Sequence, residues 1–189
     1  MQGTFWVEMQ SGDVWTLEAT RYLDRPTREF SIGGVSIPAG DYRFQDVRGT
    51  LDLSTRRRVI GSLTLARGSF YQGRRTEAGY RGRIEVSPRL SVEPGVSINW
   101  LDLPQGATTT KLLTARTSFS LSARAFVSAL VQYNSTGSSL SGSVRLRWEY
   151  QPGSELFVVW SEGRDTAGRG FPGLANRTLV VKGTRLLRF

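Results

Sequence analysis

The residues of this sequence that can do chemistry are mainly arginines. The chain of 189 residues carries 25 Lys and Arg against 16 Asp and Glu, for a net charge of +9. Only Lys111 and Lys182 are lysines, so 25 − 2 = 23 of the basic residues are arginines, whose planar fork of donors suits carboxylates and phosphates. The candidate binding residues are Arg81, Arg83, Arg116, Arg145 and Arg147. Arg81 and Arg83 are two residues apart, as are Arg145 and Arg147, so each of these two pairs lies on one face if its segment is a strand.

These arginines have two interpretations. In one, they attract anions or phosphorylated solutes into a pore. In the other, they pair with acidic residues and fill a narrow interior; the acids available are Glu77, Glu85, Glu93 and Glu149. The sequence leaves both open.

Catalytic and metal chemistry find little support. The chain has no histidine and no cysteine, which removes the usual general base, thiol catalysis and the commonest metal ligands. Acidic residues such as Asp102, or Glu149 with Glu155, could act as acid and base, but nothing in their spacing selects them. The glycine-rich Gly168-Arg169-Gly170 lacks the strand-to-helix context and the Lys-Ser/Thr of a phosphate loop. We therefore expect no enzyme activity, no cofactor and no metal site.

The elements that must position the arginines are β-strands. Apolar and polar residues alternate through most of the chain, no run approaches the roughly 20 apolar residues of a membrane helix, and no segment has helical periodicity. Glu29–Pro38 is expected to be a linker with short extended pieces. The alternation predicts eleven strands, at Gly3–Gln10, Val14–Arg21, Asp41–Leu53, Arg58–Arg67, Thr76–Val86, Leu90–Trp100, Thr109–Leu121, Ala125–Asn134, Ser143–Tyr150, Glu155–Glu162 and Asn176–Phe189.

The expected connections alternate in length along the chain. The short ones are Ser11–Asp13, Ser54–Arg57, Ser87–Arg89, Ser122–Arg124 and Gln151–Ser154. The longer ones are Tyr22–Gly40, Gly68–Arg75, Leu101–Thr108, Ser135–Gly142 and Gly163–Arg177. Short turns at one end and longer loops at the other are typical of transmembrane barrels. The pattern predicts an all-β, antiparallel, up-and-down transmembrane β-barrel of about 10–12 strands.

Aromatic residues and the final strand agree with this prediction. Trp100, Tyr133, Trp148, Tyr150 and Trp160 stand near expected strand ends, as in an aromatic girdle. The alternative is that they form the core of a soluble β-fold. Counting back from the end in twos gives a face that is apolar except at Arg185 and resembles the C-terminal assembly signal of outer-membrane barrels; its members are Val181, Leu187 and Phe189. An outward Arg185 deep in lipid would cost about 2–4 kcal/mol, and less near the interface.

Several motifs resemble one family. They are Ile37-Pro38-Ala39-Gly40 with Tyr42 and Phe44, Leu103 to Gly106, Val131 to Ser135, Arg145 to Val159 and Val180 to Phe189. Together they resemble, over residues 30–189, the C-terminal β-barrel region of a bacterial outer-membrane family of uncharacterised function. Members usually carry a domain similar to carbohydrate-binding family 9 before the barrel. The resemblance implies a location in the bacterial outer membrane. It also implies three partners: outer-membrane lipid, the barrel assembly machinery and an upstream carbohydrate-binding-like domain.

These expectations describe residues 1–189 as a single β-barrel domain or a barrel fragment. Eleven strands cannot close antiparallel, so we expect the C-terminal part of a larger barrel. The N-terminus lacks the basic and apolar regions of a secretory signal. The predicted role is a pore, an anchor or an export platform for the upstream domain, with no nucleic-acid partner. The alternative is a soluble basic β-protein that binds nucleic acid or other polyanions through arginines and aromatic rings.

Overall fold

The computed structural model describes residues 1–54, 58–168 and 170–186. Over these ranges the chain has strands and turns only, and no helix that could cross a membrane is found. The strands are β1 (Gln2–Glu8), β2 (Val14–Asp24), β3 (Phe30–Ile32), β4 (Val35–Ile37), β5 (Tyr42–Leu53), β6 (Val59–Phe70), β7 (Gly73–Ser87), β8 (Leu90–Leu103), β9 (Gly106–Ser122), β10 (Ala125–Asn134), β11 (Ser139–Gln151), β12 (Ser154–Asp165) and β13 (Gly173–Thr184).

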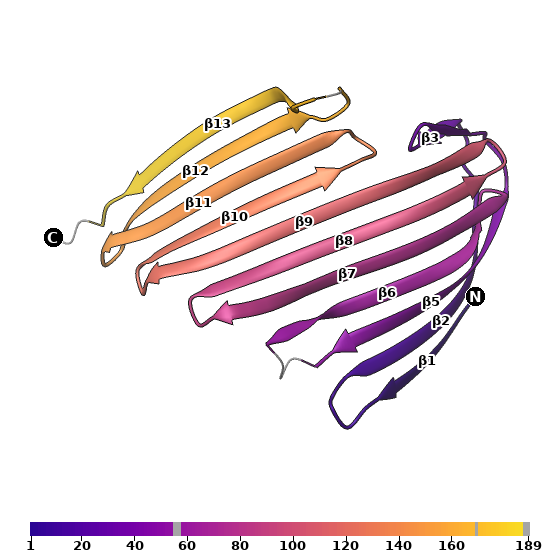
Figure 1. Ribbon diagram of the computed structural model, residues 1–189, viewed down its shortest axis with the longest axis horizontal. Helices are drawn as coiled ribbons and strands as arrows, with labels where there is room; N and C mark the ends of the chain where they lie inside the picture. Colours follow the sequence, from indigo (N-terminus) through magenta and orange to yellow (C-terminus); the bar gives the residue numbers. More distant parts are fainter. Residues whose placement is uncertain (55–57, 169, 187–189) are drawn as a thin grey trace. The chain divides into compact units, whose positions relative to one another are not determined.

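Eleven of the strands form one sheet, in which each strand is bonded to the next along the chain apart from the inserted pair β3 and β4 (Figure 1). Every pair whose register is described is antiparallel, so the predicted all-β, up-and-down architecture is confirmed. The order has two ends, β1 and β13, so the sheet of the described residues is open rather than a closed barrel. Closure needs hydrogen bonds between end strands, which alternation within each strand does not encode.

The predicted connection lengths are partly wrong. β6 and β7 are joined by only Tyr71 and Gln72, and β8 and β9 by only Pro104 and Gln105, where longer loops were expected. The strands extend beyond the segments in which apolar and polar residues alternate. Outside the band in which one face is apolar, both faces of a strand can be polar. Tyr71 and Gln72 have φ of 44° and 65°. A two-residue hairpin turn with φ positive at both positions is usually built from Asn and Gly, so its residue types gave no turn signal.

The described residues cluster into two compact units. The first consists of Met1–Gly82 with Gly95–Leu113, and the second of the described parts of Arg83–Pro94 and Thr114–Phe189. The long strands β7, β8 and β9 contribute to both. Each unit is described below by itself.

The first unit has one apolar and one polar face. Residues paired across strands share a face, and the β1–β2, β2–β5 and β5–β6 registers bring Phe5, Leu17, Gly49 and Leu65 into one row. Phe5 and Leu65 are 65% and 67% exposed, although both are large and apolar. The apolar face consists of Phe5, Val7, Trp15, Leu17, Ala19, Val47, Gly49, Leu51, Leu53, Gly61, Leu63 and Leu65, and its row through Ala19 and Val47 ends at Arg67.

The buried apolar core of the described chain lies at one end of the polar face of this unit. The two-stranded sheet β3–β4, which was expected to be a linker, packs there on the side chains of β5, the β6–β7 turn and the end of β8. Apart from Ala66, the buried apolar residues are Val35, Ile37, Tyr42, Phe44, Tyr71, Leu101 and Leu103, which we call the hairpin core.

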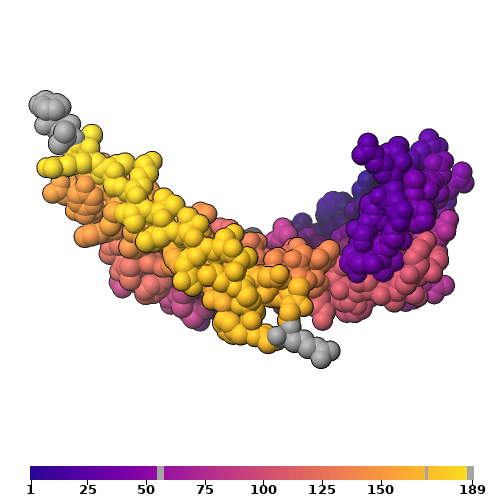
Figure 2. All heavy atoms as spheres, turned by 90° about the horizontal axis from the view of Figure 1, so that it is seen from above, coloured from indigo at the N-terminus to yellow at the C-terminus, as the bar shows by residue number. Residues whose placement is uncertain are grey.

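The second unit repeats the division into two faces. Registers from β10 to β13 bring Val127, Leu146, Val158 and Val181 into one row, and Ser128, Arg145, Val159 and Val180 into the next. In the space-filling view the orange and yellow atoms of β12 and β13 pack side by side (Figure 2). The apolar face consists of Ala125, Val127, Ala129, Val131, Tyr133, Leu140, Gly142, Val144, Leu146, Trp148, Tyr150, Leu156, Val158, Trp160, Leu179, Val181 and Gly183.

Candidate functional site

The polar face of the second unit carries an open hollow of about 450 Å³ between β9 and β12. We call it the arginine hollow. Its lining includes Arg116, Arg145, Arg147, Phe126, Phe157 and Ser128, with no acidic residue among the described lining residues. Alternation on β11 places Arg145 and Arg147 on the same side, and pairing with β10 and β12 adds their neighbours.

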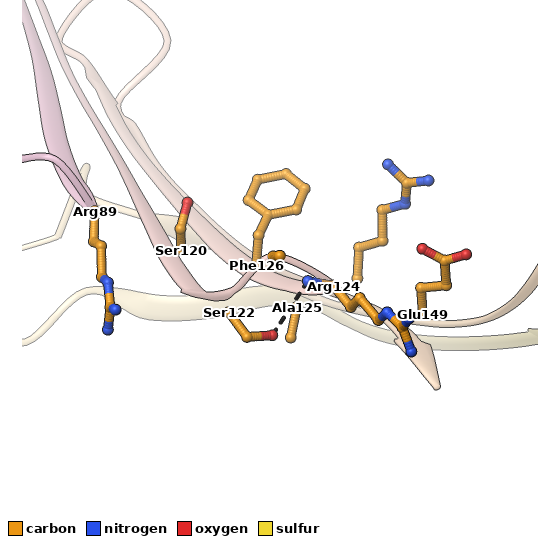
Figure 3. A pocket seen from close by; sticks show the side chains of 9 residues that line it. Arg89, Ser120, Ser122, Arg124, Ala125, Phe126 and Glu149 are labelled. Carbon is orange, nitrogen blue, oxygen red and sulfur yellow. Dashed lines mark hydrogen bonds between the residues drawn. The ribbon is translucent and has the colours of Figure 1, made fainter. Parts of the chain in front are cut away.

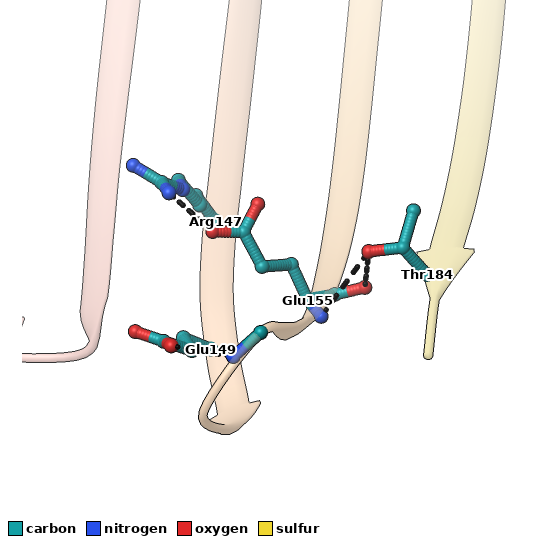
Figure 4. Close-up of polar contacts among 5 residues, drawn as sticks. Arg147, Glu149, Glu155 and Thr184 are labelled. Atoms are coloured by element: carbon teal, nitrogen blue, oxygen red, sulfur yellow. Dashed lines mark hydrogen bonds and ion pairs between the residues drawn. The ribbon is translucent and has the colours of Figure 1, made fainter. Parts of the chain in front are cut away.

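Two of the three arginines are held by carboxylates. Arg147 forms an ion pair with Glu155, whose backbone N–H and carbonyl both bond to the hydroxyl of Thr184 (Figure 4). The Arg147 guanidinium also lies 5.8 Å from the centre of the Phe157 ring. Arg116 lies 3.9 Å from Glu93. Arg145 forms no ion pair with any described residue of the chain, so its charge is available to a ligand.

A second hollow, of about 400 Å³, adjoins the first through Phe126 and Arg147, which line both. Arg89 and Arg124 border it, each at a short turn in which its backbone N–H donates to the serine hydroxyl two residues earlier. These distances are 3.3 Å for Arg89 and 3.2 Å for Arg124. Figure 3 shows this bond between Arg124 and Ser122. Together the two hollows form a basic surface that begins at the short turns carrying Arg89 and Arg124 and continues along the polar face.

The predicted arginines are divided between the units. Arg116, Arg145 and Arg147 meet in the arginine hollow. Arg83 belongs to the same unit and is linked to Arg116 through Glu93, at 3.9 Å from each. Arg81 belongs to the first unit.

Both interpretations of the basic residues have a structural counterpart. Glu85 and Glu93 pair with Arg83, as the interior-filling interpretation expected. Glu77 pairs instead with Arg48, at 3.0 Å, and Glu149 accepts a backbone hydrogen bond from Gly153. Arg145 stands outside this pairing among the described residues.

Sequence reasoning missed Phe126, Phe157, Arg89 and Arg124. Alternation alone assigns Phe157 to the polar side of β12, which was a usable signal. Its approach to Arg147 depends on the β11–β12 register, which pairs the two residues directly and has no local sequence marker.

The predicted girdle residues of the second unit all lie on its apolar face. Trp148 and Tyr150 pack edge to face near the short-turn end, with ring centres 6.1 Å apart, and Tyr133 pairs with Leu140 at the other end. Trp160 lies midway along β12, opposite Val144 and Leu179. Trp100 belongs to the first unit and is 45% exposed.

The predicted assembly signal lies mostly outside the described residues. Val181 is on the apolar face, opposite Val158, whereas Leu187 and Phe189 lie beyond the last described residue. β13 ends at Thr184, so Arg185 follows the strand instead of standing within it.

Charges on the apolar face of the second unit are confined to one end. Glu162 is buried there and pairs with Arg177 at 2.8 Å and with Arg164. Glu162 and Arg177 are opposite each other near the long connection between β12 and β13. The centre of this face thus carries no charged side chain among the described residues.

Comparisons with known proteins give a likeness of fold only. No family model matches the chain, and no curated protein does. One similar solved structure is a KdgM porin in complex with disordered oligogalacturonate, with 12% identity and a TM-score of 0.39 over 96% of this chain and 88% of that chain. Another is a NanC porin in a rhombohedral crystal form, with 8% identity and a TM-score of 0.43 over 98% of each chain.

Proposed function

We propose that this chain is a membrane-inserted β-sheet of an outer-membrane barrel, with its apolar faces toward lipid and its polar faces toward a water-filled, anion-attracting channel. The observation that carries the proposal is the exposure of the apolar faces. Leu179 and Val181, for example, are 65% and 61% exposed on a face without central charges. Soluble proteins seldom expose contiguous apolar surface of this extent.

The dimensions of the apolar face suit a bilayer. On β11 the apolar alternation runs ten steps along the strand, from Leu140, which is paired with Arg164 at the charged end of the face, to Tyr150. At about 3.3 Å per residue this spans about 33 Å. A strand tilt of about 40° reduces the height to about 25 Å, which matches the apolar band of transmembrane barrels.

Other parts of the proposal rest on the sequence. A closed antiparallel barrel would need at least one strand besides these eleven. We infer that outer-membrane lipid and the barrel assembly machinery are partners, and that a carbohydrate-binding-like domain of the same protein is anchored or served by the barrel. We propose no catalytic role.

Adjacent valines on opposite faces offer a matched test. Val158 lies on the apolar face and Val159 on the polar face of β12. Val158→Arg places a charge in lipid at a cost of about 2–4 kcal/mol, so folding into phospholipid vesicles should fall sharply, measured as the protease-protected fraction. Val159→Arg should insert nearly as well as the parent chain.

The alternative, a soluble polyanion-binding protein, gives different results in the same assay. The parent chain would then fold without lipid or detergent, and both variants would behave alike. It would also bind single-stranded nucleic acid with a steep dependence on salt. The membrane proposal is overturned if the parent chain folds without lipid or detergent and both variants behave alike. It is also overturned if the chain binds single-stranded nucleic acid in this way and does not insert into vesicles.

A further inference from the structure

We propose that the arginine hollow is a binding site for carboxylates that carry a ring, with Arg145 holding the carboxylate and Phe126 and Phe157 contacting the ring. The proposal assigns a class of solute to the proposed channel, and it depends on the channel function only for its biological role. The binding itself depends on the local geometry of β10, β11 and β12.

The charge distribution selects Arg145 as the carboxylate partner. Arg147 is engaged by Glu155 and Arg116 lies near Glu93, whereas Arg145 has no ion pair among the described residues. Its direct neighbours across the sheet, Ser128 and Val159, are uncharged. An arginine with free donors forms two parallel hydrogen bonds to a carboxylate, which fixes the orientation of the anion as well as attracting it.

The rings lie in the row next to Arg145. Phe126, Arg147 and Phe157 are paired in one line across three strands. Neighbouring strands are about 4.8 Å apart, so the two phenyl groups start about 10 Å from each other on either side of Arg147. Residues two apart on a strand are separated by about 7 Å, so a ring whose carboxylate meets Arg145 reaches this row.

The apolar rings argue against a simple inorganic anion as the preferred ligand. Phosphate or chloride could use the guanidinium groups but would leave the phenyl surfaces wet. A ring-bearing carboxylate covers them while its charge stays at Arg145, and ring contacts of this kind add favourable energy beyond the buried area. Arg145 is exposed, so binding is weak, and a channel site must release what it binds.

The test uses the full chain folded in zwitterionic detergent and titrated with benzoate or acetate, with binding followed by proton saturation-transfer NMR. Inorganic phosphate has no carbon-bound proton, so its binding is measured as displacement of benzoate. Benzoate should bind about three- to tenfold more tightly than acetate or phosphate, a difference that corresponds to one additional weak contact surface. Arg145→Gln should weaken benzoate and acetate alike by about three- to tenfold. Arg28→Gln, which removes the same charge from a connection of the first unit, is the matched control and should change neither.

The ring contact is tested at Phe157. Phe157→Leu keeps an apolar side chain for folding but removes the phenyl group, so benzoate affinity should fall toward that of acetate while acetate affinity stays constant. The proposal is overturned if phosphate binds as tightly as benzoate, or if Arg145→Gln leaves benzoate binding unchanged. Because this assay needs no bilayer, its failure is separate from a failure of the vesicle-insertion test.

Discussion

At the residue scale, Tyr71 shows how one side chain holds an unfavourable turn. Its φ of 44° is in the left-handed region, which non-glycine residues rarely adopt. The ring is buried in contact with Phe30, Tyr42, Phe44 and Phe70, and its hydroxyl donates to Asp24 at 2.6 Å. Burial, followed by the bond to Asp24, raises the pKa of the Tyr71 hydroxyl well above its usual range.

This geometry predicts an alkaline loss of stability that depends on Tyr71. The folded-state pKa lies above the unfolded value of about 10, so the contribution of Tyr71 is complete below about pH 10 and is lost as pH rises through the folded-state value. Tyr71→Phe should lower the free energy of unfolding by about 1–3 kcal/mol at pH 8, because the hydrogen bond from the buried Tyr71 hydroxyl to the half-buried Asp24 carboxylate is lost. Urea unfolding at pH 8 and pH 11 should show a smaller decline for the variant. An equal decline in both proteins would contradict the assignment.

At the element scale, β3 and β4 fold back over the polar face because they bring apolar side chains to it. Thr108 donates to the carbonyl of Gly33 at 2.9 Å, and the Tyr42 hydroxyl donates to the carbonyl of Pro38 at 2.8 Å, so the hairpin is tied to β9 and β5. Phe44 is 2% exposed in the middle of this contact. The hairpin therefore provides the first unit with a core that its two-faced sheet lacks.

Truncating this core should be costly. Phe44→Ala should lower the free energy of unfolding by about 3–5 kcal/mol, since it leaves a cavity among aromatic rings. The control is Phe171→Ala in the β12–β13 connection, where the ring is 85% exposed and only the Arg164 guanidinium is described over it, so the change should stay within about 1 kcal/mol. Denaturant unfolding in detergent gives both values. Similar small effects would mean that the hairpin core contributes little.

At the scale of the whole molecule, the two faces predict a strict alternation of environment along each strand. The chain has no cysteine, so single cysteines can be introduced and labelled one at a time without background. A polarity-sensitive dye at Leu17 or Val158 should report lipid, and at Thr16 or Val159 water, because neighbouring residues point to opposite sides. Fluorescence in vesicles with lipid-phase and aqueous quenchers provides the readout. Equal quenching at neighbouring positions would exclude the proposed orientation.

The sequence by itself determined the strands and their faces. Alternation is a local property, so Val144, Leu146 and Trp148 could be assigned to one side, and Arg145 and Arg147 to the other, without any partner strand. The same alternation predicts the eleven strands of the sheet. Turns with usual residue types were also visible, such as Pro152-Gly153, where Gly153 has a φ of 76°.

Only the tertiary structure decided which residues meet. The row from Phe126 through Arg147 to Phe157 depends on two registers, and the ion pair of Glu77 with Arg48 joins residues far apart in the chain. The β3–β4 hairpin has too few residues for a periodic signal, and its stability comes from contacts with β5, β8 and the β6–β7 turn. Such contacts depend on pairing between distant segments. The arginines could therefore be assigned to a face from the sequence. Which of them lacks an ion pair among the described residues, and which rings lie beside it, could not.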